Sequence, residues 1–303
     1  MPDAIGNKTA HDYHLDVPAP EQGFFAKGLG HGDWGAKNRL SHLFNPKSGN
    51  TVMLAFDHGY IMGATAGLER MDVTIAPLCR YADVLMATRG AIRSCIPPTV
   101  HNAICLRATH DASVLIDDMS TGNGVGADME AAIRMNASAV AIQCFIGGAG
   151  EARSLETLCR AVDAGERYGI PVLGVTAVGK EMARTTQYFL LATRMLAELG
   201  ASFVKTYYCD DFEKVVAACP VPIVIAGGKK LPEDEALTMA YRAISEGAHR
   251  AISDGARGVD MGRNIFQSEH PAAMCRAVAK IVHEKFTDRE AFQFYQELAA
   301  QDN

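Results

Sequence analysis

The sequence predicts one α/β domain, a single parallel (β/α)8 barrel, the TIM-barrel class, preceded by an N-terminal arm. Three observations indicate this fold. The chain has 303 residues, eight short apolar runs recur along it, and stretches of helical period separate these runs. This length is long for an ordinary domain but typical of such a barrel. With 48% hydrophobic and 21% charged residues, the composition is that of a globular protein.

The eight apolar runs are predicted to be the barrel strands. Each run is almost continuously apolar rather than alternating, as a strand covered on both faces of a parallel sheet requires. The runs are TVMLAF (51–56), ADVLMAT (82–88), AICLRAT (103–109), SAVAIQCF (138–145), PVLGVTA (171–177), ASFVKTYY (201–208), PIVIAGG (222–228) and RGVDMG (257–262).

The stretches between these runs carry helix signals. Residues 154–169 place apolar residues at helical spacing and end at Gly169, a typical C-cap. Residues 187–200 also end in glycine, and residues 231–247 begin with Pro232 and acidic side chains, as a first helical turn prefers. The alternation favours a closed barrel over an open doubly wound sheet, which would usually carry a glycine-rich turn after its first strand.

The expected domain organisation has three parts. Residues 1–45 form an arm with short helices, residues 46–290 the barrel, and residues 291–303 a C-terminal helix or tail. One internal repeat stands out, because AISEGAHR (243–250) is followed directly by AISDGARG (251–258). This tandem duplication is expected to add a helical turn or bulge on the face away from the chemistry, with no catalytic role.

Composition excludes several classes of function. The net charge is −6 and no basic stripe is interleaved with aromatic residues, so we expect no nucleic-acid partner. The polar N-terminus lacks the apolar core of a secretory signal, and no run has the length of a membrane span. Eight scattered cysteines without a CxxC pair indicate reduced, buried thiols in a cytoplasmic protein. We expect no metal and no bound cofactor.

The ends of the last two predicted strands indicate a phosphate site. Gly227 and Gly228 end the seventh strand, and Gly262 and Arg263 end the eighth. Glycines let backbone N–H groups approach an oxyanion closely, and barrels commonly bind phosphate at these two ends. Arg263 would add charge-assisted hydrogen bonds. The alternative is ordinary strand-ending glycines, and the pairing in barrel register favours phosphate.

Lys205 near the end of the sixth strand is the candidate nucleophile. Its neighbours are apolar, so burial would disfavour the ammonium and lower its pKa. Nearby cations would lower the pKa further, and Lys180 and Lys229 are candidates. A neutral amine can attack a ketone to give an imine, which is an electron sink for C–C cleavage. The alternatives are a lysine that only binds phosphate and a lysine at the surface.

Other strand ends supply further candidates. Asp57 and His58 suit proton transfer and hydroxyl binding, although an aspartate there also suits a loop cap. His58 is expected to orient other groups by hydrogen bonding, because nothing near it has metal-ligand spacing. Tyr207 is a further candidate catalytic residue, and Arg89, Lys180, Lys229 and Phe145 are expected at the substrate site.

Five segments resemble the class I aldolase family of phosphorylated-ketone barrels. The similarity begins near residue 25 and runs to the C-terminus. The segments are LSHLFNPKSGNTVMLAFDHG (40–59), GLERMDVTIAPL (67–78), FVKTYY (203–208), CPVPIVIAGGKKLPEDEAL (219–237) and GVDMGRNIFQSEHP (258–271). The resemblance implies that Lys205 forms the Schiff base and that Asp57 lies against the substrate. It also implies a phosphate site made by Gly227, Gly228, Gly262 and Arg263.

Within that family the chain looks most like a thiolase branch. The resemblance then implies transfer of an acetyl group from a phosphorylated pentanedione to coenzyme A, as a co-substrate, in degradation of the signal autoinducer-2. The products would be acetyl-CoA and dihydroxyacetone phosphate. A homo-oligomer, a ring or decamer, is also implied. The alternatives are a fructose-bisphosphate type of aldolase and a catalytically silent sugar-phosphate binding protein.

Phe145 departs from the family pattern. Aldolase relatives generally carry a tyrosine two residues before the glycine at this strand end, and here that glycine is Gly147. Because phenylalanine cannot shuttle protons, general-acid catalysis would fall to Tyr207, Asp57, His58 or water.

Overall fold

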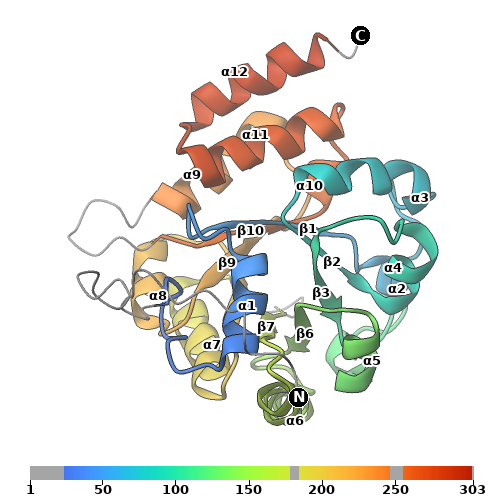
Figure 1. Cartoon of the computed structure of the whole chain (residues 1–303), viewed down its shortest axis with the longest axis vertical. Helices are drawn as coiled ribbons and strands as arrows, with labels where there is room; N and C mark the ends of the chain where they lie inside the picture. The colour runs from blue at the N-terminus through green and yellow to red at the C-terminus, as the bar shows by residue number, and fades with distance from the viewer. Residues whose placement is uncertain (1–23, 178–183, 246–254, 302–303) are drawn as a thin grey trace, which may run out of the picture.

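Eight parallel strands close into a barrel in the computed structural model, which describes residues 24–177, 184–245 and 255–301. Helices cover the outside of the barrel (Figure 1). The predicted fold is confirmed, and each of the eight apolar runs contains one barrel strand. The strands are β1 Thr51–Ala55, β2 Val84–Thr88, β3 Ala103–Arg107, β6 Ala139–Cys144, β7 Val172–Thr176, β8 Phe203–Tyr207, β9 Ile223–Ala226 and β10 Gly258–Met261.

The strand register brings the ends of the last three strands together. The order around the barrel is β1-β10-β9-β8-β7-β6-β3-β2, and β1 closes on β10 with Thr51 opposite Gly258. On β8, Lys205 lies opposite Val224 of β9. On β10, Asp260 lies opposite Ala226 of β9. Side chains that point inward from β8 and β10 can therefore meet inside the barrel.

The helices follow the predicted alternation. The longer helices are α1 Trp34–Leu43, α4 Arg89–Cys95, α5 Met129–Arg134, α6 Glu151–Tyr168, α7 Thr186–Glu198, α8 Phe212–Ala218, α9 Glu233–Ser245, α11 Pro271–Glu284 and α12 Asp288–Ala299. The short elements are α2 Gly59–Met62, α3 Met71–Thr74 and α10 Arg263–Phe266, with 3-10 turns η1 Ala76–Tyr81 and η2 Met119–Gly122. As predicted, α6 is capped at Gly169, which takes the left-handed conformation (φ 64°).

The C-terminal helices pack together at one side of the barrel. Helix α12 contacts both α9 and α11, and the three are seen stacked in Figure 1. A capping box formed by Thr287 and Glu290 starts α12. The boundary expected at residue 290 therefore falls inside this helix. Of the duplicated segment, residues 246–254 lie outside the described residues, so its expected turn or bulge stays a prediction.

One element that the sequence did not indicate lies between β3 and α5. Strands β4 (Thr109–His110) and β5 (Gly124–Val125) pair as a small antiparallel sheet. The loop that joins them includes η2 and forms part of the mouth of the barrel cavity described below.

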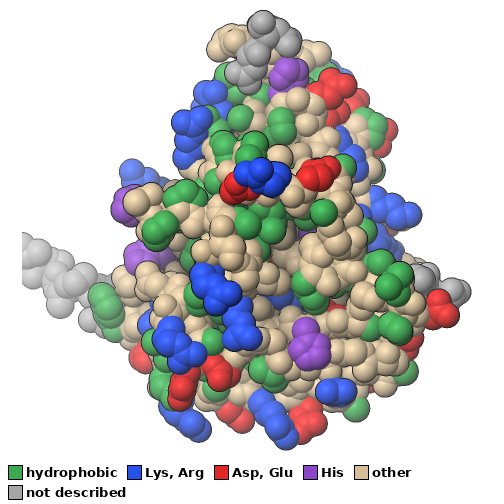
Figure 2. Space-filling model, turned by 90° about the vertical axis from the view of Figure 1, so that its right-hand side faces the viewer, with side chains coloured by type: hydrophobic (Ala, Val, Ile, Leu, Met, Phe, Trp, Pro, Cys, Tyr) green, Lys and Arg blue, Asp and Glu red, His purple; other side chains and the backbone are tan. Residues whose placement is uncertain are grey.

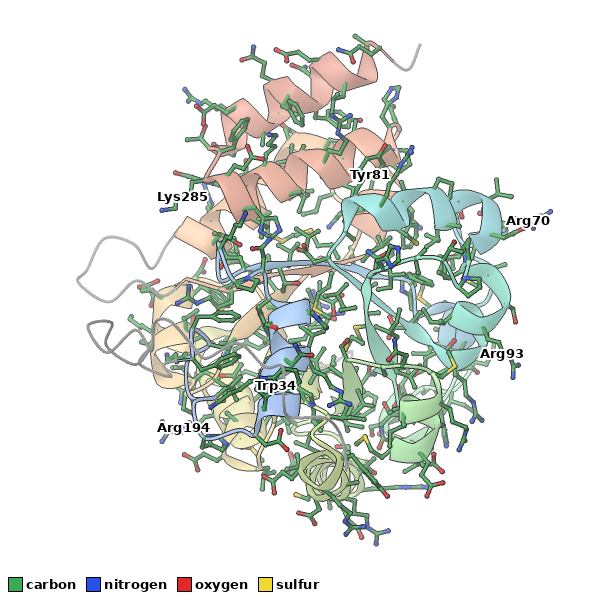
Figure 3. All side chains as sticks on the ribbon, in the orientation of Figure 1. Trp34, Arg70, Tyr81, Arg93, Arg194 and Lys285 are labelled. Atoms are coloured by element: carbon green, nitrogen blue, oxygen red, sulfur yellow. The ribbon has the colours of Figure 1, made fainter. Side chains whose placement is uncertain are left out.

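The surface is mixed in charge on the face that Figure 2 shows, where acidic and basic side chains are interspersed. None of the described helices has both the length and the apolar character that a membrane crossing requires. Trp34, at the start of α1, is 79% exposed and is labelled on that helix in Figure 3.

Candidate active site

A cavity of about 310 Å³ opens at the carboxyl ends of the barrel strands. Most of the residues predicted for the site line it, although they come from five different strand ends. The predicted residues that line the cavity are Asp57, His58, Phe145, Lys205, Tyr207, Gly227, Gly228, Gly262 and Arg263. The structure therefore brings the candidate nucleophile and the candidate phosphate site into one space.

Two predicted residues do not line this cavity. Arg89 is exposed and is the first residue of α4, so the chain has already turned outward there. Lys229 is also exposed, because it follows Gly228, whose left-handed conformation (φ 68°) ends the strand in a tight turn. Both assignments to the substrate site are corrected. Lys180 lies outside the described residues.

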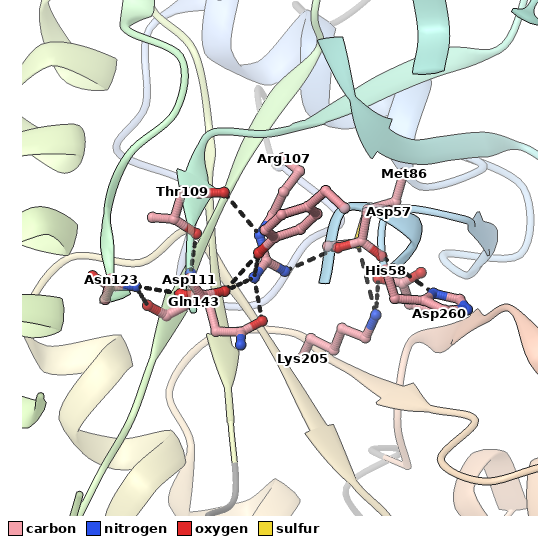
Figure 4. Close-up of polar contacts among 11 residues, drawn as sticks. Asp57, His58, Met86, Arg107, Thr109, Asp111, Asn123, Gln143, Lys205 and Asp260 are labelled. Atoms are coloured by element: carbon pink, nitrogen blue, oxygen red, sulfur yellow. Dashed lines mark hydrogen bonds and ion pairs between the residues drawn. The ribbon is translucent and has the colours of Figure 1, made fainter. Parts of the chain in front are cut away.

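Lys205 points into the barrel from β8. Its side chain is 12% exposed, and its Nζ lies 2.9 Å from Oδ2 of Asp260 on β10. The ammonium also approaches Sδ of Met86 on β2, at 3.7 Å (Figure 4). The amine is therefore inside the cavity, where a bound ketone would meet it.

The predicted direction of the Lys205 pKa shift is wrong. Burial does oppose the charged ammonium, but the carboxylates of Asp260 and Asp57 outweigh it, so the pKa of Lys205 is raised. The sequence argument counted burial and possible cations, but the charges that face Lys205 are anions. In the free enzyme the amine is consequently protonated, and it must lose a proton before it can attack a carbonyl.

Asp57 belongs to a buried network centred on Arg107. The Arg107 guanidinium, 3% exposed, donates to Asp57 at 2.9 Å and to Asp111 at 2.6 Å. It also donates to the Tyr60 hydroxyl at 3.0 Å and to Gln143 (Figure 4). One buried guanidinium is therefore shared by two carboxylates, and each carboxylate accepts a hydrogen bond from it.

This network keeps Asp57 ionised. Burial alone would raise the pKa of Asp57, but contact with His58 and the charges of Arg107 and Lys205 lower it well below the ordinary range. An ionised carboxylate accepts hydrogen bonds but has no proton to give. Asp57 therefore suits binding of a substrate hydroxyl better than general-acid catalysis.

His58 lies beside Asp57 with one ring nitrogen unused. Its Nδ1 is 3.9 Å from Oδ1 of Asp57, and its ring stacks on Phe266 at 5.6 Å between centroids. Within the described part of the chain, its buried Nε2 has no hydrogen-bond partner. A buried polar atom of this kind is well placed to meet a substrate oxygen.

Tyr207 and Phe145 both line the cavity, but only Tyr207 brings a polar group to it. The ring of Tyr207 stacks under the Arg184 guanidinium, 4.0 Å from the ring centroid, and its hydroxyl offers a proton donor at the cavity. Phe145 is buried and contributes only apolar surface.

The predicted phosphate site is built by close backbone packing. A Cβ at Gly262 would lie 2.1 Å from the carbonyl oxygen of Ala55, so only glycine fits beside the end of β1. Asn264 ties the two glycine ends together, because its amide donates to the carbonyl of Gly227 at 2.7 Å and accepts from the N–H of Leu231 at 2.8 Å. Arg263 follows at the cavity rim.

Sequence reasoning missed two residues that the site depends on. Asp260 lies within β10 and Arg107 ends β3, and neither residue was assigned a role from the sequence. A charged residue inside an otherwise apolar strand is itself a signal, because nothing but function or pairing keeps it there. That signal was available in GVDM (258–261) and in AICLR (103–107). Within residues 24–177, 184–245 and 255–301, no group of three or more His, Cys, Asp or Glu side chains forms a candidate metal site.

Comparison with known proteins places this cavity in a family. Residues 51–268 match the model of the DeoC/LacD family aldolases. A protein of Enterobacter sp. (strain 638) named 3-hydroxy-5-phosphonooxypentane-2,4-dione thiolase is 53% identical over 298 residues, 98% of each chain. A protein of the same name from Klebsiella pneumoniae is 52% identical, also over 98% of each chain.

Solved structures agree on the fold. An archaeal fructose 1,6-bisphosphate aldolase superposes with a TM-score of 0.70 at 24% identity, over 82% of this chain and 99% of that one. A fructose-bisphosphate aldolase from Slackia heliotrinireducens gives 0.71 at 18% identity, over 87% and 90%. The family match and the two relatives at more than half identity together decide the assignment: this chain belongs to the DeoC/LacD family of aldolases.

Proposed function

We propose that this protein is a Schiff-base thiolase that transfers the acetyl group of 3-hydroxy-5-phosphonooxypentane-2,4-dione to coenzyme A. The observation that carries the proposal is the presence of Lys205 in one cavity with Gly227, Gly228, Gly262 and Arg263. The names of the relatives at 50–53% identity supply the substrate. A phosphate held by the glycines would present the neighbouring ketone to Nζ of Lys205.

The chemistry begins with an imine. Lys205 condenses with the ketone beside the phosphate-bearing carbon and releases water. The resulting iminium accepts electrons, so it activates the C–C bond one carbon further along the substrate. The sulfur of coenzyme A attacks the acetyl carbonyl, that bond breaks, and its electron pair forms an enamine on Lys205. Protonation and hydrolysis of the enamine give dihydroxyacetone phosphate, and acetyl-CoA leaves.

The other residues of the cavity have roles that fit this sequence. Ionised Asp57 would accept a hydrogen bond from the substrate hydroxyl, because Arg107 holds it in the charged form. The unpartnered Nε2 of His58 and the hydroxyl of Tyr207 would contact substrate oxygens. Arg263 would neutralise part of the phosphate charge.

Assembly and cellular role belong to the same proposal. We propose that the enzyme works as a homo-oligomer in the cytoplasm and degrades the phosphorylated form of autoinducer-2. An exposed tryptophan such as Trp34 supports assembly, because tryptophan is enriched at protein interfaces.

A product assay with the phosphorylated dione tests the proposal. We expect acetyl-CoA and dihydroxyacetone phosphate only when coenzyme A is present, and neither product from the Lys205→Ala variant. Turnover of fructose 1,6-bisphosphate to glyceraldehyde 3-phosphate, without coenzyme A, would instead support the aldolase alternative. Binding of either phosphorylated compound without turnover would support a silent binding protein.

A further inference from the structure

Of the two buried carboxylates that line the cavity, Asp57 and Asp260, only Asp57 pairs with Arg107. Asp57 and Asp111 both pair with Arg107, whereas Asp260 has contact with a single charged group, Nζ of Lys205 at 2.9 Å. Its side chain is fully buried, and among the described residues the Lys205 ammonium is the one group in polar contact with it. Burying a carboxylate with a single polar partner is costly, so its retention needs a reason.

The surroundings of Nζ leave Asp260 as its proton acceptor. Met86 Sδ, at 3.7 Å, is a weak acceptor. Asp57 is near enough to act on Lys205 electrostatically, but Arg107 already occupies its Oδ2. Phe145, in the same cavity, has no proton to exchange.

We infer that Asp260 is the catalytic acid–base group of the Schiff-base step, taking a proton from Lys205 and later delivering one to the departing hydroxyl. This inference rests on the proposed function, because it requires that Lys205 condense with a ketone.

Asp260 carries each proton that the condensation moves. The ammonium of Lys205 gives one proton to the Asp260 carboxylate, and the free amine attacks the ketone carbon. As the C–N bond forms, the carbonyl π electrons move to oxygen, Asp260 protonates that oxygen, and the nitrogen returns a proton to Asp260. The carboxyl of Asp260 then protonates the carbinolamine hydroxyl, which leaves as water while the nitrogen lone pair forms the iminium. The step therefore ends with an ion pair, iminium and carboxylate, as it began with one.

The electrostatics of Asp260 and Asp57 support different roles for the two carboxylates. Burial raises the pKa of Asp260 more than the Lys205 ammonium lowers it, whereas the pKa of Asp57 is held low. Two carboxylates whose environments drive their pKa values apart suit different roles, here proton carrier and fixed anion.

The other titratable groups around the pair do not compete for this role. Facing Asp260 and Lys205 are Asp57 after β1, Cys105 and Arg107 on β3, and Tyr207 on β8. Burial raises the pKa of Cys105 well above its ordinary value, so it remains a thiol. Arg107 keeps its proton, because its carboxylate partners raise its pKa in spite of burial.

The pH dependence of imine formation tests the inference. The wild type and Asp260→Asn are mixed with dihydroxyacetone phosphate and borohydride, and the rate of adduct formation on Lys205 is followed by mass spectrometry. With Asp260 as internal acceptor, the wild-type rate is flat between the two pKa values of the pair. We expect Asp260→Asn to be slower by about 10²–10⁴-fold at neutral pH. Its rate should rise about tenfold per pH unit, because water must now take the proton.

The control is Asp128→Asn, the same charge change at the N-cap of α5, where asparagine also caps well. It should react at the wild-type rate. If Asp260 only holds the ammonium in its charged form, Asp260→Asn will react as fast as the wild type or faster, and the inference is overturned.

Two further outcomes separate this inference from the proposed function. A wild-type rate that itself rises tenfold per pH unit through neutrality overturns the inference even if Asp260→Asn does not fold. A wild type that forms no adduct at all refutes the proposed function, and the inference falls with it.

Discussion

At the scale of single residues, the site separates substrate binding from chemistry. Arg263 directly follows Gly262 in the cavity lining, whereas the Lys205–Asp260 pair carries the reaction. An interaction made equally in the ground state and the transition state changes KM and leaves kcat unaltered. The phosphate end of the cavity is therefore expected to govern affinity.

We expect Arg263→Ala to raise KM for the phosphorylated dione by about 10–100-fold, the value of one or two charge-assisted hydrogen bonds. The kcat should remain within about threefold of the wild type. Steady-state kinetics measure both, with Arg93→Ala on the outside of α4 as the control. A large loss in kcat with unchanged KM would show that Arg263 acts in the chemical step.

Arg107 is the cation that pairs with two buried carboxylates, Asp57 and Asp111. Arg107→Met removes the guanidinium that pairs with buried Asp57 and Asp111, so we expect a loss of about 3–5 kcal/mol in the free energy of unfolding at neutral pH. In the wild type, the lowered pKa of Asp57 means that its stabilising contribution is present above its unfolded pKa and is lost as the pH falls through the folded value.

The pH dependence of this loss gives a second readout. In Arg107→Met, Asp57 keeps His58 and Lys205 but loses the guanidinium, so its pKa is lowered less than in the wild type. Acidification below the unfolded pKa therefore costs the variant less stability, and the stability gap between the two proteins should narrow from about pH 5 to about pH 3, as urea denaturation at each pH would reveal. A gap that is constant over this range would argue against the charge network.

At the scale of elements, the strands were predictable and the side-chain partners were not. Continuous apolar runs indicate strands buried on both faces, and all eight contain a barrel strand. The ends of β9 and β10 also indicated the glycine pair that lines the cavity. The Lys205–Asp260 contact depends on which inward-pointing residues of β8 and β10 lie at the same height in the barrel. That height is set by the strand register around the closed barrel, which neither segment's sequence specifies by itself. The direction of the Lys205 pKa shift was wrong for the same reason.

The opposite end of the barrel is held by a chain of three polar side chains. His283, in the last turn of α11, contacts the Ser48 hydroxyl at 2.8 Å and the Asp83 carboxylate at 2.9 Å. Asp83 also accepts from the N–H of Val52 at 2.7 Å. This chain ties the starts of β1 and β2 to the last helix but one, at the end of the barrel that usually serves stability.

We expect His283→Ala to lower the free energy of unfolding by about 1–3 kcal/mol, because Ser48 and Asp83 each lose a hydrogen bond. Thermal and urea denaturation measure the loss. Since His283 is remote from the cavity, kcat and KM should match the wild type. An unchanged melting temperature would mean that water replaces the imidazole without cost.

At the scale of the whole molecule, the proposed assembly predicts a role for an exposed aromatic residue. Trp34 exposes 79% of its surface on α1, and burying a tryptophan against another subunit removes a large apolar area from water. Trp34→Glu would place an unpaired charge in that contact. We expect the wild type to sediment as a homo-oligomer and Trp34→Glu to shift toward smaller species. Identical sedimentation of the two proteins would exclude Trp34 from the subunit contact.

The most direct test of the whole account is the identity of the residue that borohydride traps. The protein is incubated with dihydroxyacetone phosphate, reduced with borohydride, digested and mapped by mass spectrometry, beside Lys205→Ala. The account predicts a single adduct on the peptide that contains Lys205 and none in the variant. An adduct on another lysine, or an equal yield from Lys205→Ala, would contradict it.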